Sequence, residues 1–251
     1  MRTIKFRIEF SAPFLIASAV TDPGNYDMVP VLTGNLPYVP AGSFQGIVKD
    51  AIRSHCSENA SSWDGYALCK GQLKGGNEAF CKPDTGSNPC PLCRIFGMPG
   101  GEVEAGYYFS GVYVESDYAD QFKKIAGLPW DAFLVKRVRN SIDSELRRAA
   151  ERKLFSSGLA NVPVPLTGTI SEEPAYRQYD SKIADFDYLL ILLGLRLITE
   201  IGRSQSRGYG ECRIIPEEDT DWKRKIEDHI SAWKLAKYKG GTYDKDLPAA
   251  C

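Results

Sequence analysis

The sequence predicts an α+β fold, and two observations lead to it. Near the start of the chain the apolar residues Ile4, Phe6, Ile8 and Phe10 alternate with charged residues, the pattern of a half-buried strand. Further along, segments with strand and helix patterns follow in the order strand, helix, strand, strand, helix, strand. This order is the split βαβ plan of ferredoxin-like and RRM-type domains. We therefore expect one such domain, interrupted by long insertions.

The first helix is expected directly after a loop. Residues 17–42 are crowded with Pro, Gly, Asn and Asp, which is typical of a long irregular connection. Ser43 can then cap the N-terminus of a helix. Apolar residues recur behind it at intervals of three and four, namely Phe44, Ile47, Val48, Ala51 and Ile52. Lys49 and Arg53 share the opposite face of this helix, one turn apart.

The later elements follow the same reasoning. Residues 105–115 are rich in strand formers, and residues 132–139 begin another extended segment. A charged insertion at 141–155 is expected to be partly helical. Residues 186–199 are too long and too rich in leucine for a typical strand and predict a buried helix, followed by a last strand at 209–215. Behind that strand, a terminal amphipathic helix is predicted by Trp222, Ile226, Ile230 and Trp233.

Composition narrows the class of protein. A chain of 251 residues with 43% hydrophobic content can bury one substantial core. It has no apolar stretch long enough for a membrane span and no signal-peptide core, so we expect a soluble, cytoplasmic protein. The formal net charge is −1, which disfavours a protein that coats nucleic acid through a large positive field. Any nucleic-acid site is therefore expected to be local.

The cysteines cluster in one insertion. Residues 57–101 are rich in Gly, Ser, Asn and Cys and have no clean period, so something other than a core must order them. Cys90 and Cys93 have the spacing of a zinc-knuckle half-site, and Cys69 and Cys81 are the expected partners. His55 or Cys56 would serve as alternative ligands. The competing interpretation is a set of reduced cysteines in an irregular insertion.

The strongest single signal is a glycine loop between a predicted helix and the last strand, residues 202–210. Its glycines would let backbone N–H groups approach phosphate oxygens, and its serines and arginines would add further donors. The loop lacks the Lys-Ser/Thr end of a Walker motif, and a strand follows it, so a nucleotide-binding P-loop is disfavoured. A glycine-rich turn with incidental arginines is the alternative. The expected RNA-contacting residues of the loop are Gly202, Arg203, Ser204, Ser206, Arg207 and Gly208.

Basic residues are also concentrated in one stretch of the chain. Between Lys136 and Lys153 there are seven basic residues against three acidic ones. This excess favours phosphate contacts at Arg137 and Arg139, with a solvated helix face as the alternative. Past Pro216 the balance turns acidic, so that end is expected to face away from RNA.

Four motifs occur together in an order that resembles the RAMP superfamily. They are Pro-Ala-Gly-Ser-Phe-Gln-Gly at 40–46 before the helix that carries Lys49, Cys-Pro-Leu-Cys-Arg-Ile-Phe-Gly at 90–97, Ile-Asp at 142–143 with the following Ala-rich segment that ends in Leu-Phe, and the glycine loop. The sequence is most similar to the repeated backbone subunit of type III CRISPR effector complexes, which serve antiviral defence. The matched segments run from about residue 4 to residue 215.

This resemblance implies a function and a set of partners. Such subunits polymerise with further copies of themselves and with other subunits along a CRISPR guide RNA. A thumb-like hairpin, here within 129–180, kinks the duplex of the guide with single-stranded target RNA. One loop aspartate then cuts the target with Mg²⁺ or Mn²⁺, so the protein would be an endonuclease, a hydrolase of RNA. Carried over, that residue is Asp27, with Asp22 as the alternative and a structural role in the turn as the competing interpretation.

The resemblance also assigns guide contacts to the first helix. These would come from Ser43, Gln45, Lys49 and Arg53, although Gln45 stands where the family often has lysine and Lys49 where it has arginine. Residues 1–251 would then form a single RAMP-type domain that ends in a helix and tail at 217–251. Two other functions remain open: a non-catalytic scaffold of the same complex, and a stand-alone RRM-like module for single-stranded RNA.

Overall fold

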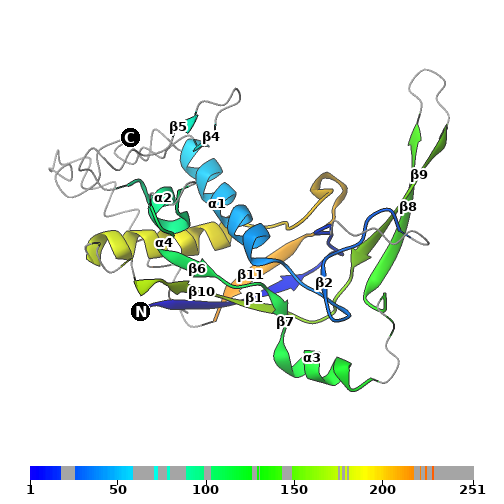
Figure 1. Cartoon of the computed structure of the whole chain (residues 1–251), viewed down its shortest axis with the longest axis horizontal. Coiled ribbons are helices and arrows are strands. Elements are labelled where there is room, and N and C mark those ends of the chain that lie inside the picture. Colours follow the sequence, from blue (N-terminus) through cyan, green and yellow to red (C-terminus); the bar gives the residue numbers. More distant parts are fainter. Residues whose placement is uncertain are drawn as a thin grey trace.

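The computed structural model describes residues 1–17, 26–58, 71–72, 78–79, 89–98, 103–125, 129, 131–142, 149–174, 176, 179, 181–217, 221, 224 and 228. These residues form an α+β fold, which confirms the predicted class (Figure 1). The predicted terminal helix around Trp222 and Trp233 lies outside the described residues.

An antiparallel sheet forms the base of the molecule. Its strands are β1 (Thr3–Phe10), β6 (Tyr107–Phe109), β10 (Leu166–Glu172) and β11 (Cys212–Pro216), in the order β11-β1-β10-β6, and the short β7 (Tyr113–Val114) also pairs with β10. Ile4, Phe6 and Ile8 of β1 are buried, while the charged residues between them face solvent. The alternation predicted for the first strand is confirmed.

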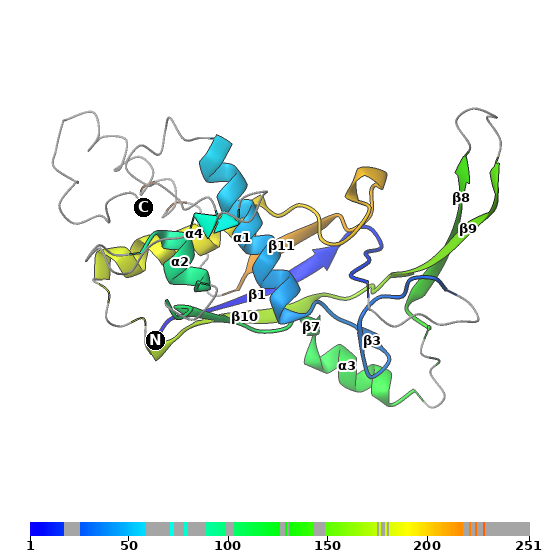
Figure 2. The same cartoon turned by 45° about the horizontal axis from the view of Figure 1, so that its top comes forward.

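Two long helices cover one face of this sheet, as both cartoon views show (Figures 1 and 2). They are α1 (Ala41–Glu58) and α4 (Ser181–Leu197), which pack against each other. Phe44, Val48 and Ile52 of α1 are fully buried, as their three and four residue spacing predicts. The buried helix predicted at 186–199 is α4, and the predicted last strand is β11.

Shorter elements surround this core. The helix α2 (Pro91–Phe96) lies beside α1, and α3 (Ser116–Lys123) follows β7. Two small antiparallel pairs, β2 (Leu32–Thr33) with β3 (Leu36–Pro37) and β4 (Gly71–Gln72) with β5 (Glu78–Ala79), lie within the segments predicted as loops. Within the part of the chain that the structure describes, no helix is both long and apolar enough to cross a membrane.

A long hairpin projects away from the sheet and helices. It is formed by β8 (Leu134–Ile142) and β9 (Ala149–Ala160), which pair antiparallel with an irregularity between Asn140 and Ile142 (Figures 1 and 2). This arrangement corrects two predictions. The described part of 141–155 is strand and not helix, because its residues pair across the hairpin. The extended segment at 132–139 belongs to this hairpin, and the third strand of the sheet is β10.

Candidate nucleic-acid interface

The glycine loop follows α4 and is held against the segment after β1. Gly202 and Gly210 adopt φ angles of +105° and +80°, which residues with a side chain rarely adopt. A Cβ at Gly202 would lie 2.6 Å from the carbonyl oxygen of Leu15, and one at Gly210 would lie 2.0 Å from that of Ile201. The N–H of Arg203 donates to the Leu15 carbonyl oxygen at 2.8 Å. Glycine at both positions therefore permits the close backbone packing that fixes the loop.

The outer part of the loop presents donors to solvent. It contains a short 3-10 turn at Gln205–Arg207, preceded by Ser204 in the left-handed region at φ +64°. Arg203, Ser206 and Arg207 are exposed. A rigid backbone thus carries two exposed guanidinium groups and a hydroxyl, which are groups that bind phosphodiester oxygens.

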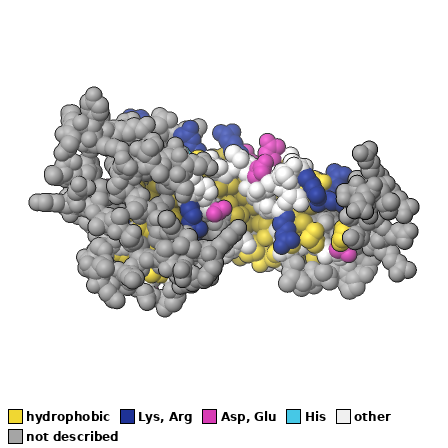
Figure 3. All heavy atoms as spheres, turned by 90° about the horizontal axis from the view of Figure 1, so that it is seen from above, with side chains coloured by type: hydrophobic (Ala, Val, Ile, Leu, Met, Phe, Trp, Pro, Cys, Tyr) yellow, Lys and Arg dark blue, Asp and Glu magenta, His cyan; other side chains and the backbone are white. Residues whose placement is uncertain are grey.

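The hairpin contacts this loop through Arg139. The guanidinium carbon of Arg139 lies 5.3 Å from the centroid of the Tyr209 ring, a cation–π geometry. Its Nη1 atom is 3.5 Å from the hydroxyl oxygen of Ser204. Arg137 is exposed on the same strand. Figure 3, which views the molecule from above, shows a group of Lys and Arg side chains toward the hairpin end. The structure therefore brings Arg139 of the hairpin and the glycine loop together.

Asp27 lies beside the hairpin, where Ser156 of β9 binds it midway along the paired strands. The Ser156 N–H donates to Oδ2 of Asp27 at 2.5 Å, and the Ser156 hydroxyl donates to the same oxygen at 3.1 Å. These two bonds, with a smaller contribution from the charge of Lys136, hold the pKa of the exposed Asp27 carboxyl below its usual value. The alternative candidate, Asp22, lies outside the described residues.

The predicted contacts on α1 occupy a different place. The ammonium group of Lys49 lies 5.7 Å from the ring centroid of Phe96 in α2. In Figure 1, α1 stands between α2 and the glycine loop. Nε of Arg53 is buried and has no hydrogen-bond partner among the described residues.

The face of α1 beside the glycine loop carries other side chains. Asp50 and Ser54 line a hollow there together with Gln205 of the loop. Ser43 is exposed and Gln45 is half-exposed near the start of the helix. The RNA-contacting roles of Ser43, Gln45, Lys49 and Arg53 stay predictions.

Cys90 and Cys93 bracket the first turn of α2. Both are 2% exposed, and the N–H of Arg94 donates to the Cys90 carbonyl oxygen at 3.0 Å. Two thiols on one tight turn fit half of a tetrahedral zinc site. Cys69 and Cys81 lie outside the described residues. Among the residues that are described, including His55, no cluster of three or more metal-ligating side chains occurs.

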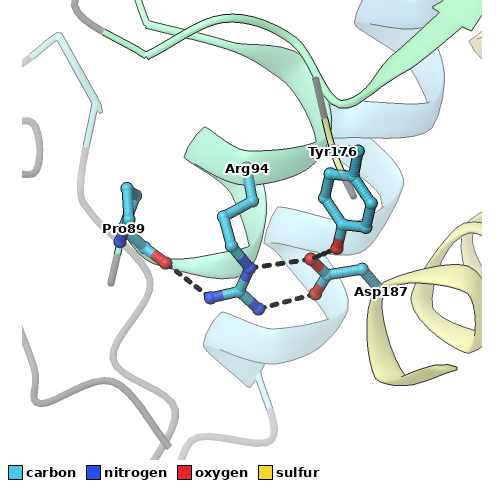
Figure 4. A network of polar contacts seen from close by, with 4 residues as sticks. All are labelled: Pro89, Arg94, Tyr176 and Asp187. Carbon is cyan, nitrogen blue, oxygen red and sulfur yellow. Dashed lines mark hydrogen bonds and ion pairs between the residues drawn. The ribbon is translucent and has the colours of Figure 1, made fainter. Parts of the chain in front are cut away.

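A buried polar network holds this cysteine turn against α4 (Figure 4). The guanidinium of Arg94 donates from Nε and Nη2 to the two carboxylate oxygens of Asp187, at 2.8 and 2.7 Å. It also donates to the carbonyl oxygen of Pro89, and the Tyr176 hydroxyl donates to Asp187. Burial raises the pKa of Asp187, and the Arg94 charge and the Tyr176 bond oppose that rise. The network therefore links the insertion to the core.

Sequence reasoning missed three residues of these sites: Ser156, Tyr209 as the partner of Arg139, and Asp187. Asp187 carried a usable signal, because a lone acidic residue inside the apolar segment 186–199 needs a buried partner. Ser156 carried none, since its contact with Asp27 joins residues 129 positions apart.

The sequence matches the model of a known protein family over most of its length. The model described as the RAMP superfamily matches residues 7–213, which span the chain from β1 to β11. The chain belongs to the RAMP superfamily. No match to a curated protein sequence was found.

The fold of this RAMP protein is also similar to solved structures. One is a chain of the Type III-B Cmr-beta bound to cognate target RNA, with a TM-score of 0.57 and 10% identity, covering 90% of this chain and 99% of that one. Another is a chain of Type III-B Cmr-beta in the apo state, with a TM-score of 0.56 and 10% identity, covering 86% and 98%. At this identity the similarity concerns the fold.

Proposed function

We propose that this RAMP protein is a backbone subunit of a type III CRISPR effector complex that binds the guide RNA and cuts bound target RNA. The contact of Arg139 with Tyr209 and Ser204 is the observation that carries the proposal, because it joins the basic hairpin to the glycine loop. A ribose-phosphate chain that follows this surface would meet cationic and N–H donors along its length.

The proposed core is ferredoxin-like, interrupted by a thumb-like hairpin. The four main sheet strands lie in the spatial order fourth, first, third, second, and the two long helices follow the first and third strands. The β8–β9 hairpin is inserted between the second and third of these strands. It carries the exposed apolar side chains of Val138, Leu154 and Phe155, which suit contact with nucleobases.

The proposed cleavage is assigned to Asp27. Attack of the target's own 2′-hydroxyl on the adjacent phosphate requires nucleophile and leaving group in line, a geometry that a kink at the hairpin would provide. Bound Mg²⁺ or Mn²⁺ would stabilise charge on the phosphoryl oxygens. The exposed, ionised carboxylate of Asp27 would orient that hydrated ion, with RNA phosphates as further ligands.

Zinc is proposed as a structural ion of the insertion. Cys90 and Cys93 would supply two thiolates, and Cys69 and Cys81 the other two, with His55 as an alternative. The partners proposed for the subunit are guide RNA, single-stranded target RNA, further copies of the chain and other subunits of the complex.

Cleavage is tested with the assembled complex, matched target RNA and Mg²⁺ or Mn²⁺. We expect regularly spaced products from the natural chain and intact target from Asp27→Ala. Asp117→Ala in α3 is the matched control, because Asp117 is also an exposed aspartate but belongs to a helix outside the hairpin. Regular cutting by Asp27→Ala would contradict the catalytic assignment.

A non-catalytic scaffold is the second candidate function. The two bonds from Ser156 to Asp27 favour it, because they also suit an aspartate that only ties its loop to the hairpin. Tight guide binding by the natural chain, with intact target after long incubation, would select the scaffold.

A further inference from the structure

The segment that contains Asp27 is attached to the hairpin through the backbone of β9. The N–H of Asp27 donates to the carbonyl oxygen of Ser156 at 2.9 Å, and the N–H of Gly158 donates to that of Met28 at 2.9 Å. Met28 and Ser157 form a parallel bridge. This short segment therefore runs beside β9 and is attached to it by backbone hydrogen bonds.

Ser156 also binds the Asp27 side chain from two directions. Its N–H and its hydroxyl both donate to Oδ2, at 2.5 and 3.1 Å. Bonds to an ionised acceptor are stronger than bonds between neutral groups, so this pair restricts the rotation of the carboxylate. Neither bond uses Oδ1, and the aspartate is exposed to solvent.

We propose that Ser156 is the positioning residue for the Asp27 carboxylate. It fixes Oδ2 to strand β9, so that Oδ1 can approach a hydrated cation at the place on the RNA where the hairpin docks. This inference rests on the proposed cleavage function and deepens it: when the hairpin docks on the RNA, the Asp27 carboxylate is placed at the same time. An aspartate on an untethered loop would sample several rotamers, and each misplaced rotamer would lower the rate.

The pKa of Asp27 provides a second measurement that tests the role of Ser156. The donors that face the carboxylate are the N–H and hydroxyl of Ser156 on β9 and the N–H of Asp27 itself. A positive charge acts on it from Lys136 on β8, whose ammonium lies 5.3 Å from the ring centroid of Tyr26. Removal of the Ser156 hydroxyl takes away one bond to the ionised form and leaves the N–H bond and Lys136. The pKa of Asp27 should therefore rise while the fold is retained.

The test uses Ser156→Ala and Ser156→Thr, with Ser171→Ala as the matched control. Threonine keeps the hydroxyl and the strand preference of the position, whereas Ser171 bonds Thr3 in the central sheet. In the free chain, carbon-13 NMR would follow the titration of Asp27. In the assembled complex, the cutting rate would be measured against Mn²⁺ concentration, with guide binding measured separately.

We expect Ser156→Ala to raise the Asp27 pKa, to slow cutting about tenfold as the loss of one charge-assisted hydrogen bond predicts, and to raise the Mn²⁺ concentration for half-maximal rate. Ser156→Thr should restore all three values, and guide binding should not change. An unchanged Asp27 pKa and an unchanged cutting rate in Ser156→Ala would overturn the role of Ser156 and leave the proposed cleavage function intact. A raised pKa with an unchanged rate would overturn the positioning role and leave Ser156 as a structural tie. Natural-rate cutting by Asp27→Ala would instead reject the assignment of cleavage to Asp27, and intact target with the natural chain would reject the proposed cleavage function.

Discussion

The guanidinium of Arg139 lies over the ring of Tyr209, with 5.3 Å between the guanidinium carbon and the ring centroid. These residues belong to different parts of the chain, the hairpin strand β8 and the end of the glycine loop. Their contact brings together two cationic segments that lie far apart in the sequence. Ser204, the other residue of the loop that Arg139 contacts, is 65 positions away from it. A phosphate chain can thus meet both segments on one surface.

Arg139→Ala is expected to weaken guide RNA binding about tenfold and to lower the salt dependence of binding by about one counterion. Arg139→Lys should keep most of the salt dependence but lose part of the affinity, because lysine lacks the planar fork. Filter binding at several salt concentrations measures both quantities. Arg213→Ala is the control, because Arg213 is exposed on β11 between the buried Cys212 and Ile214 and so faces away from the helices. An equal loss of guide RNA affinity in Arg213→Ala would contradict the assignment of Arg139 to the RNA-binding surface.

Gly210→Ala tests the rigidity of the glycine loop. Alanine at a φ of +80° costs about 1 kcal/mol or more, and the new Cβ would lie 2.0 Å from the Ile201 carbonyl oxygen, so the backbone must shift. We expect a loss of more than about 2 kcal/mol in the free energy of unfolding by urea. Gly34→Ala is the matched control, since Gly34 also has a positive φ, +58°, but its Cβ would meet open space. Similar losses of unfolding free energy in both variants would show that the close packing of Gly210 against Ile201 does not contribute to stability.

The fold was predictable where one period dominates a segment. β1 alternates, α1 repeats at three and four residues, and α4 contains an uninterrupted apolar run from Tyr188 to Leu195. β10 was missed although its pattern is regular: Leu166, Gly168 and Ile170 are buried, and Thr167 and Thr169 lie between them. The inward glycine leaves room for the Phe6 ring, so the apolar signal of the strand is weakened at the position where the packing is tightest.

The candidate site was predictable in composition but not in geometry. The glycine loop stands out locally, because its glycines and arginines are consecutive in the chain. The 141–155 segment was assigned helical character because its charges suit a solvated helix, whereas its strand conformation depends on pairing across the hairpin. Lys49 was placed on the correct helix, but only the packing of α2 shows that its face turns toward Phe96.

The Arg94–Asp187 pair should behave as a unit in unfolding. Arg94→Met alone or Asp187→Leu alone leaves one buried polar partner uncompensated, so each should lower the free energy of unfolding by about 3–5 kcal/mol. The double variant Arg94→Met with Asp187→Leu should cost less than the sum of the two, because neither charge is then buried alone. Urea unfolding of the four proteins measures the coupling. Additive losses would show that the two groups do not act as a pair.

Zinc binding by the insertion is checked by metal analysis of the purified chain. We expect about one zinc ion per chain, lost in Cys90→Ser and in Cys93→Ser together with a lower melting temperature, because a structural zinc site contributes folding energy directly. Cys212→Ser is the matched control: Cys212 is buried in β11, and burial, with the nearby charges of Glu200 and Glu211, raises the pKa of its thiol to about 12. A thiol that resists ionisation is a poor metal ligand, so the zinc content of Cys212→Ser should equal that of the natural chain. Zinc retained by both Cys90→Ser and Cys93→Ser would remove these residues from the site.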